Sequence, residues 1–373
     1  MKILYFTGGY SPHDRRFLGA VVEQGMDVSL LSFHAGAMEH SGYNLPDGVQ
    51  ALGGIAKSTR LDWFALPRLV RQVQSTARRI QPDVIHAGPM HLGAFLAAAA
   101  HEHPLVSMSW GSDLLADARS GKRRLMARFT LSRSDAFIGD CQAVRKSAIE
   151  LGMAHERIVT FPWGVNLEQF YPSADRQVRE QLGWRDATVL ISTRSWEPLY
   201  GVDILVQAFL KASRQESSLR LLLVGGGSQK ALLEGMIEDA RTCDKVHLVE
   251  RVSESELPRY YNSGDLYVSV SHSDGSSVSL LEAMACGLPV LVSDIPGNRE
   301  WVEHGANGWL FPDGDVEGLT QNILMLARNR DGLKPAGMLG REITEQRADW
   351  QKNHVRMFQA YSMAIDHAKR NRK

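Results

Sequence analysis

The sequence contains little cysteine, no excess of either charge and no long apolar segment. Its three cysteines, Cys141, Cys243 and Cys286, are widely separated and form no CxxC pair. An odd number of cysteines without a CxxC pair argues against a disulfide framework and against a zinc site, so we expect reduced thiols in a cytoplasmic protein. The 42 basic and 42 acidic residues balance, and this balance argues against a nucleic-acid partner held by phosphate neutralisation.

Apolar segments long enough for a membrane are missing as well. The N-terminal residues MKILYFTGG reach their glycines too early for the apolar core of a secretory signal. The longest apolar stretch, residues 92–100, is about half of the roughly 18 residues that a spanning helix requires. The sequence therefore predicts neither export by this route nor a transmembrane helix.

Short aliphatic runs alternate with helical patterns along the chain, which is typical of βα units and parallel sheets. With 373 residues, the chain is long enough for two domains. A first series of strands is predicted at residues 2–7, 27–33, 83–87, 105–110, 136–139 and 157–161, with helices including 15–24, 67–80 and 142–151. A second series is predicted at residues 188–193, 220–224, 246–249, 266–270 and 289–293, with helices including 202–212 and 229–241.

Turn-rich residues 161–173 separate the two series and are the predicted linker. We therefore expect an α/β protein of two Rossmann-like, doubly wound domains that face each other across a cleft, at residues 1–165 and 166–349. A polar helical pattern over roughly 341–370 predicts a last helix, near 350–373, that crosses back to the first domain. Ligands of such sheets bind outside the carboxyl ends of the strands, so the strand-to-helix junctions supply the candidate site residues.

The most specific junction begins at Ser273 and reads Ser-Asp-Gly-Ser-Ser-Val-Ser-Leu-Leu-Glu-Ala-Met-Ala-Cys-Gly-Leu-Pro-Val. A turn of small residues leads into a helix near Ser277, where free backbone N–H groups suit a phosphate or a sugar hydroxyl. The residues of that turn and helix start are Gly275, Ser276, Ser277 and Val278. Glu282 lies roughly 7–8 Å further along the helix axis, so Asp274 and Glu282 are predicted to hold a sugar and a ribose.

This segment resembles the signature of the retaining glycosyltransferase family 4, which has the GT-B architecture of two Rossmann-like domains. In that family an acidic residue precedes, by eight positions, the Glu of LEAMA-x-G-x-P, and Asp274 and Glu282 have this spacing. The resemblance implies that Asp274 contacts hydroxyls of the donor sugar and that Glu282 binds the ribose. The family usually has Glu at the first position, so Asp274 is one methylene shorter.

Two further junctions of the second domain support the resemblance. The resemblance implies that Arg194 binds the donor diphosphate, which a guanidinium fork can hold through two oxygens. Tyr200 stands where the family has a Lys, and it offers one hydrogen bond but no charge. The glycine run after strand 220–224 resembles the family's turn beneath the nucleotide. The remaining candidates are Gly225 and Gly227 in that turn, and Arg251 and Val252 beside the base.

The first domain departs further from the family pattern. The Gly8–Gly9 pair allows close approach of the backbone to a donor phosphate, so Gly9 is a candidate donor contact. His13 and Asp14 are candidates for the acceptor side. Trp110-Gly-Ser-Asp resembles the family's His-Gly-x-Asp, but Trp110 can stack on a sugar ring and cannot act as a base. Asp113 is retained as a candidate catalytic residue, and the alternative is that it caps the following helix.

Together these elements predict a metal-independent, retaining glycosyltransferase that moves a hexose-type sugar to an acceptor hydroxyl. The donor is a nucleotide sugar, with UDP the first choice of carrier and GDP the second, and no other cofactor is expected. In relatives, the leaving diphosphate helps to deprotonate the acceptor, while Arg194 and the helix start near Ser277 would stabilise its charge. The predicted catalytic residues are Asp274, Arg194, Asp113, Trp110 and His13. Two alternatives are a nucleotide-sugar 2-epimerase of the same fold and a catalytically inactive nucleotide-sugar-binding protein.

The acceptor is expected to be a glycan or a lipid-linked molecule. Relatives with lipid-linked acceptors touch anionic membranes through a basic first domain, and a basic cluster is present here at Lys122, Arg123, Arg124, Arg128 and Arg133. The cluster predicts peripheral contact with the inner face of a membrane. The alternative is a simply solvated helix.

Overall fold

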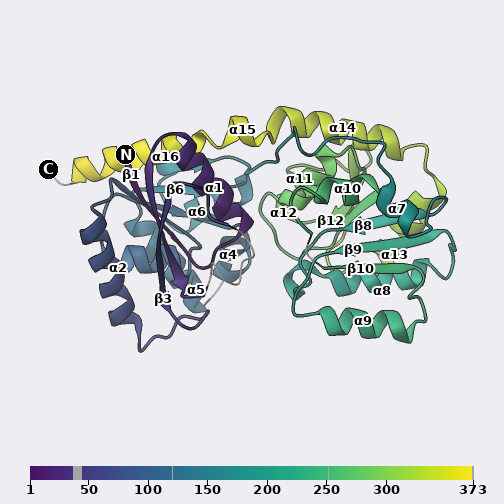
Figure 1. The fold of residues 1–373 in the computed structure, drawn as a ribbon, viewed down its shortest axis with the longest axis horizontal. Helices are drawn as coiled ribbons and strands as arrows, with labels where there is room; N and C mark the ends of the chain where they lie inside the picture. The colour runs from purple at the N-terminus through teal and green to yellow at the C-terminus, as the bar shows by residue number, and fades with distance from the viewer. Residues whose placement is uncertain (37–43, 120, 251, 372–373) are drawn as a thin grey trace. The chain divides into compact units, whose positions relative to one another are not determined.

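The computed structural model describes residues 1–36, 44–119, 121–250 and 252–371. The chain divides into two compact units, one formed by Met1–Phe161 with His354–Lys373 and the other by Pro162–Asn353 (Figure 1). We call them unit 1 and unit 2 and describe each by itself. In the described ranges, no helix is both long and apolar enough to cross a membrane.

Unit 1 is built on a parallel sheet, which in the described part of the chain has seven strands in the order β3-β2-β1-β4-β5-β6-β7. Strand β1 is buried from Ile3 onward, as expected for parallel strands that are covered on both faces. The strands are β1 (Lys2–Thr7), β2 (Asp27–His34), β3 (Val49–Ala56), β4 (Val84–Ala87), β5 (Leu105–Met108), β6 (Ala136–Gly139) and β7 (Ile158–Thr160).

Helices cover both faces of the unit 1 sheet. The helices α2 (Leu66–Ile80), α3 (Gly93–Ala100) and α5 (Gly121–Arg133) share one hydrophobic core with β1, β2 and β4, and α6 (Gln142–Glu150) packs into the same core. Helix α1 (Pro12–Glu23) packs on β2, and the C-terminal helix α16 (Arg356–Asn371) lies along β4 to β7 (Figure 1). The short helix α4 (Ser112–Leu115) follows β5.

Unit 2 repeats this plan with six parallel strands among its described residues, in the order β10-β9-β8-β11-β12-β13. They are β8 (Thr188–Ser192), β9 (Leu219–Val224), β10 (Val246–Val249), β11 (Leu266–Ser269), β12 (Val290–Ser293) and β13 (Gly308–Phe311). One face is covered by α8 (Val202–Ala212), α9 (Lys230–Asp239) and α13 (Val316–Arg328). The other is covered by α7 (Gln177–Gln181), α10 (Leu257–Asn262), α11 (Val278–Ala285) and α14 (Leu333–Arg347).

The structure confirms the predicted α/β class with two Rossmann-like sheets, and it corrects two details. Strands β3 and β13 were not predicted, and both lie at the edge of their sheet, where a strand needs less continuous apolar sequence. The predicted helical segment 341–370 is broken into α14, α15 (Trp350–Asn353) and α16. It breaks because the backbone of Val165 pairs with Ala348 and Trp350 at N–O distances of 2.8 and 3.1 Å, which draws these residues out of a continuous helix.

Candidate functional site

The strand order of unit 2 reverses between β8 and β11. From β8 the chain continues to β9 and β10 on one side, whereas β11, β12 and β13 extend the sheet on the other. Ligands of open α/β sheets bind at such a switch point, outside the carboxyl ends of the two strands. The loops that leave these ends contain Arg194 after β8 and Asp274 after β11.

Arg194 is held between these two loops. Its two terminal nitrogens donate to Ser277 Oγ and Ser279 Oγ at 2.7 and 2.9 Å, and to Asp274 Oδ2 at 2.7 Å. The ring of Tyr200 covers the guanidinium, with its centroid 4.2 Å from Cζ. Burial by itself lowers the pKa of Arg194, but the Asp274 carboxylate and three neighbouring tyrosines together outweigh it, and the net pKa lies above the ordinary value. The structure therefore brings together a fixed, buried cation and a carboxylate at the switch point.

Two buried N–H groups near this switch point have no hydrogen-bond partner. Among the described residues, no acceptor bonds the buried Nε of Arg194 or the buried indole Nε1 of Trp196. Buried N–H groups without a partner are rare because each costs free energy. Both atoms are inaccessible to solvent in this structure, so an acceptor oxygen of a ligand would reach them only when the surrounding side chains move.

The turn before α11 is largely occupied by contacts within the protein. Asp274 Oδ1 accepts from the backbone N–H of Gly275 at 3.0 Å, and Ser276 Oγ accepts from the indole of Trp301 at 3.2 Å. Ser277 is the N-cap residue of α11, and its side chain makes no capping bond within the helix. Val278 is the first residue of the helix, so the free N–H groups predicted from the sequence are those of its first turn.

Glu282 lies one turn into α11 and is oriented by a tyrosine that the sequence analysis missed. The hydroxyl of Tyr261, from α10, donates to Glu282 Oε2 at 2.7 Å. The same hydroxyl lies 2.6 Å from Thr193 Oγ1, next to Arg194. Burial raises the pKa of Tyr261 well above its ordinary value, and the Glu282 charge adds to this, so the hydroxyl stays a donor. No local pattern marks Tyr261 or Thr193, because only the fold brings them to Glu282.

The glycine turn after β9 packs directly against the Arg194 loop. A Cβ on Gly225 would lie 2.6 Å from the Arg194 carbonyl oxygen, and one on Gly227 would lie 2.4 Å from that of Trp196. Both positions therefore exclude any side chain, which gives a packing reason for the glycines. Val252 is partly buried against the core of unit 2, whereas Arg251 lies outside the described residues.

In unit 1, Asp113 ties two loops together. Its carboxylate accepts from the backbone N–H groups of Met90 and Trp110 at 2.9 and 3.0 Å, and also from the hydroxyl of Ser109. Burial raises its pKa in spite of these bonds. The alternative that Asp113 caps the following helix is wrong, since Gly111 is the N-cap of α4.

Among the other unit 1 candidates, His13 and Trp110 lie close together, whereas Asp14 has a structural role. The rings of His13 and Trp110 approach to a centroid distance of 5.7 Å, and a Cβ on Gly9 would meet no atom within 4 Å. Asp14, by contrast, is fully buried and forms a capping box with Ser11 at the start of α1. The expectation that Asp14 lines the acceptor side is therefore wrong, because its carboxylate faces the protein interior.

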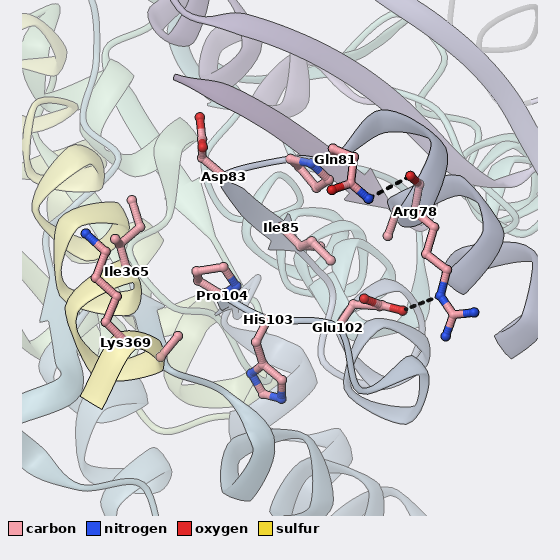
Figure 2. Close-up of a pocket in the computed structure, with 12 residues that line it drawn as sticks. Arg78, Gln81, Asp83, Ile85, Glu102, His103, Pro104, Ile365 and Lys369 are labelled. Carbon is pink, nitrogen blue, oxygen red and sulfur yellow. Dashed lines mark hydrogen bonds and ion pairs between the residues drawn. The ribbon is translucent and has the colours of Figure 1, made fainter. Parts of the chain in front are cut away.

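Two further features concern possible metal sites and cavities. The described residues contain no group of three or more His, Cys, Asp or Glu side chains that is placed to hold a metal ion. A cavity of about 490 Å³ lies in unit 1 at the amino ends of β4 and β5 (Figure 2). Arg78 and Glu102 form an ion pair on its rim at 3.4 Å. The predicted site residues of unit 1 follow the carboxyl ends of the strands, and none of the predicted site residues lines this cavity.

Comparison with known proteins places the two halves of the chain in one family. The family model described as "Glycosyl transferases group 1" matches residues 175–360, and the model described as "Glycosyltransferase Family 4" matches residues 7–169. The D-inositol 3-phosphate glycosyltransferase of Thermobispora bispora is 29% identical over 248 residues, which cover 64% of this chain and 58% of that relative. The chain thus spans less than two thirds of the length of this relative.

A second relative and two solved structures extend the comparison. A GDP-mannose-dependent phosphatidylinositol monomannoside mannosyltransferase of Mycolicibacterium smegmatis is 24% identical over 74% of both chains. HepE of Anabaena in complex with UDP-glucose superposes with a TM-score of 0.76 at 21% identity, over 99% of this chain and 98% of that one. Sucrose-phosphate synthase of Thermosynechococcus elongatus superposes with a TM-score of 0.79 at 18% identity, over 98% of this chain and 100% of that one. With both units matched by family models and the fold shared along the whole length, the chain belongs to glycosyltransferase family 4 and has the GT-B fold.

Proposed function

We propose that the protein is a retaining glycosyltransferase that moves a hexose-type sugar from a nucleotide sugar to an acceptor hydroxyl without a metal ion. UDP is the first choice of carrier and GDP the second. The observation that carries the proposal is Arg194, a buried guanidinium at the switch point of unit 2 with an unsatisfied Nε–H. A diphosphate supplies the charge and the acceptor oxygens that such a group needs.

The proposed roles follow from what each side chain can reach. Arg194 and the N-terminus of α11 would bind the diphosphate and stabilise the charge that grows on it as the sugar leaves. Asp274 pairs with Arg194 at 2.7 Å in this structure, and its carboxylate would accept from the sugar hydroxyls when the diphosphate takes its place on the guanidinium. Glu282, oriented by Tyr261, would accept from the ribose hydroxyls.

The missing family Lys is replaced by a stacking interaction. Tyr200 adds no charge, but its ring face lies over Arg194 and stabilises a cation in a partly desolvated site. Burial raises the pKa of the Tyr200 hydroxyl, so this group stays protonated and can donate to a phosphate oxygen. Diphosphate binding would thus depend on one cation and on N–H and O–H donors.

The names of similar proteins support the choice of donor and acceptor classes. HepE was solved with UDP-glucose, and the mannosyltransferase relative uses GDP-mannose. The named acceptors, inositol 3-phosphate and phosphatidylinositol monomannoside, carry free hydroxyls on a polar or lipid-linked scaffold. We accordingly propose a glycan or lipid-linked acceptor for this chain.

A thermal-shift panel of UDP, GDP, ADP and their sugar conjugates tests the proposal on wild type and Glu282→Ala. A nucleotide at a hundred times its Kd should stabilise the wild type by about 2.7 kcal/mol, and the variant should respond much less. The preferred donor should then release free nucleotide when acceptors are added, at the same rate in the presence of a chelator. The absence of any shift, or conversion of the donor to an isomer without an acceptor, would exclude the proposed transfer.

A further inference from the structure

The ion pair between Arg194 and Asp274 occupies the place that the proposed function gives to the donor diphosphate. The two side chains meet at 2.7 Å, and they are only 10% and 17% exposed. A diphosphate that binds this guanidinium has to displace a carboxylate that already holds it. The strength of the pair therefore opposes the binding of any anion at this point.

The guanidinium is held by groups that can stay in place when its anion changes. Its Nη1 donates to the hydroxyls of Ser277 and Ser279 at 2.7 and 2.9 Å, and the ring of Tyr200 lies over it at 4.2 Å. Among the described residues, Nη2 donates to Asp274 alone. An exchange of partner at Nη2 thus requires a movement of Asp274 and not of Arg194.

Asp274 has little to bind once it leaves the guanidinium. Its Oδ1 accepts from the backbone N–H of Gly275 at 3.0 Å, whereas its Oδ2 is bonded only to Arg194 in the part of the chain that the structure describes. A displaced Asp274 keeps one hydrogen bond and has no partner for its second oxygen. This state is unfavourable, because a mostly buried charge without a partner costs free energy.

A donor sugar can supply the missing partner, and a free nucleotide diphosphate cannot. The hydroxyls of a sugar donate hydrogen bonds to a carboxylate. The terminal phosphate of a free diphosphate offers acceptor oxygens and negative charge, which repel the displaced carboxylate. The binding of the diphosphate and the binding of the sugar are therefore coupled through the side chain of Asp274.

We propose that Asp274 makes the donor site selective for a nucleotide sugar over the free nucleotide diphosphate. Without a sugar, Asp274 stays on Arg194 and competes with the diphosphate. With a sugar attached, the sugar hydroxyls hold Asp274 away from the guanidinium. Once the sugar has moved to the acceptor, Asp274 returns to Arg194 and displaces the nucleotide. This inference rests on the proposed function and adds to it a device for the release of the product.

Calorimetric titration of the full-length protein with UDP and UDP-glucose, and with GDP and GDP-mannose, tests the inference as a ratio of two Kd values. For the pair that binds, the wild type should bind the sugar conjugate about tenfold more tightly than the free nucleotide. Asp274→Asn removes the competing charge, so it should bind the free nucleotide about fivefold more tightly than the wild type does. In this variant the two Kd values should differ by less than about threefold.

Matched controls separate this coupling from an effect of net charge and from misfolding. Asp294→Asn makes the same change of charge in unit 2, where Asp294 pairs with Arg299 at the surface, and it should leave both Kd values within about twofold of wild type. Asp274→Glu keeps a carboxylate and should restore the preference of the wild type. The thermal midpoint of each variant shows whether unit 2 stays folded, and the ratio measured on the wild type needs no variant.

Equal Kd values for the nucleotide and its sugar conjugate in the wild type would overturn the inference and leave the nucleotide site itself intact. An Asp274→Asn variant that binds the free nucleotide no better than the wild type would also overturn it. So would an equal gain in Asp294→Asn, because the gain would then come from net charge. If neither pair of compounds binds the wild type, the proposed function fails and the inference fails with it.

Discussion

Units 1 and 2 have the same order of strands, yet the loops at the carboxyl ends of their strands carry different chemistry. In unit 2 a buried guanidinium, Arg194, is held by side chains of the opposite loop and keeps a spare donor. In unit 1 a buried carboxylate, Asp113, lies between the loops that follow β4 and β5, and backbone N–H groups of both loops are bonded to it. One arrangement suits an anionic ligand, whereas the other fixes the shape of the protein around it.

The comparison shows how one fold can be used for two tasks. A charge that is matched by movable side chains can exchange its partner for a ligand, since Asp274 or Ser277 can give way to a phosphate oxygen. A charge that is matched by backbone groups cannot exchange partners without moving the chain. We therefore expect the nucleotide to depend on unit 2, and the acceptor side of the reaction to depend on rings such as His13 and Trp110 in unit 1.

The largest effect is expected from Arg194→Ala. Loss of a positioned donor to a developing charge typically lowers kcat by about 10²–10³-fold, and here Asp274 would also lose its partner. Initial rates of nucleotide release from the preferred donor measure the effect. Arg185→Ala, which breaks only an exposed pair with Glu180, should retain the wild-type rate. A rate for Arg194→Ala within tenfold of wild type would contradict the assignment.

The next effect concerns the stability of unit 1 in acid. His86 is fully buried, it shares a hydrogen bond of 2.8 Å with the Tyr361 hydroxyl on α16, and burial lowers its pKa to about 3. In the unfolded chain, His86 becomes protonated below its ordinary pKa of about 6.5, whereas in the folded chain it stays neutral at the same pH. This contribution to stability is therefore complete above pH 6.5 and is lost as the pH falls toward 3. Between pH 7 and 5 the loss is about 2 kcal/mol.

Urea unfolding of wild type and His86→Gln at several pH values measures this loss, because the variant lacks the titrating group. Asp14→Asn is a control of opposite sign. Burial raises the pKa of Asp14 to about 6, so its contribution is present at low pH and is lost as the pH rises through 6, by about 1 kcal/mol between pH 5 and 7. Equal pH dependence in wild type and His86→Gln would show that His86 is accessible to protons in the folded state.

A smaller effect is expected from Tyr261→Phe, which tests the ribose contact of unit 2. The change removes the hydroxyl that donates to Glu282, and a hydrogen bond to a charged group contributes about 1.5–3 kcal/mol. We expect the Kd for the preferred ribonucleotide to rise by about tenfold, toward the lower end of that range, and the Kd for its 2′-deoxy analogue to change much less. Tyr267→Phe is the matched control, because its hydroxyl bonds Ser279. It should weaken both nucleotides equally, through Arg194.

Sequence patterns predicted the strands with continuous apolar runs and missed two edge strands, β3 and β13. Strands β1 and β6 have the predicted bounds, because their apolar runs are continuous and end at polar or glycine residues. Strand β10 also has the predicted bounds, although it lies at a sheet edge and contains His247. Strand β3 contains Gly53 and Gly54 and is only partly buried, so it lacks the apolar run of the other strands. Strand β13 contains the short apolar run Trp309–Phe311 and was missed in spite of it.

The candidate site could be predicted where its residues are close in sequence. Asp274 and Glu282 belong to one segment, and Arg194 belongs to a junction with its own pattern. Tyr261 could not be predicted, because a tyrosine in α10 has no sequence feature that points to Glu282. The same limit explains Asp14, which stands beside His13 in the sequence but turns into the protein at the start of α1.

The smallest effect, and the sharpest test of the comparison, is expected in unit 1. His13→Ala removes the ring that lies 5.7 Å from Trp110, and such a contact contributes about 0.5–1.5 kcal/mol. If the two rings shape the acceptor side, kcat/KM for the acceptor should fall by roughly 2- to 12-fold, while the Kd of the nucleotide stays within twofold of wild type. His155→Ala, an exposed histidine of the same unit, should change neither value. A nucleotide Kd that rises as much as kcat/KM falls would mean that the His13 ring acts on the donor, and the division of tasks between the two units would then be wrong.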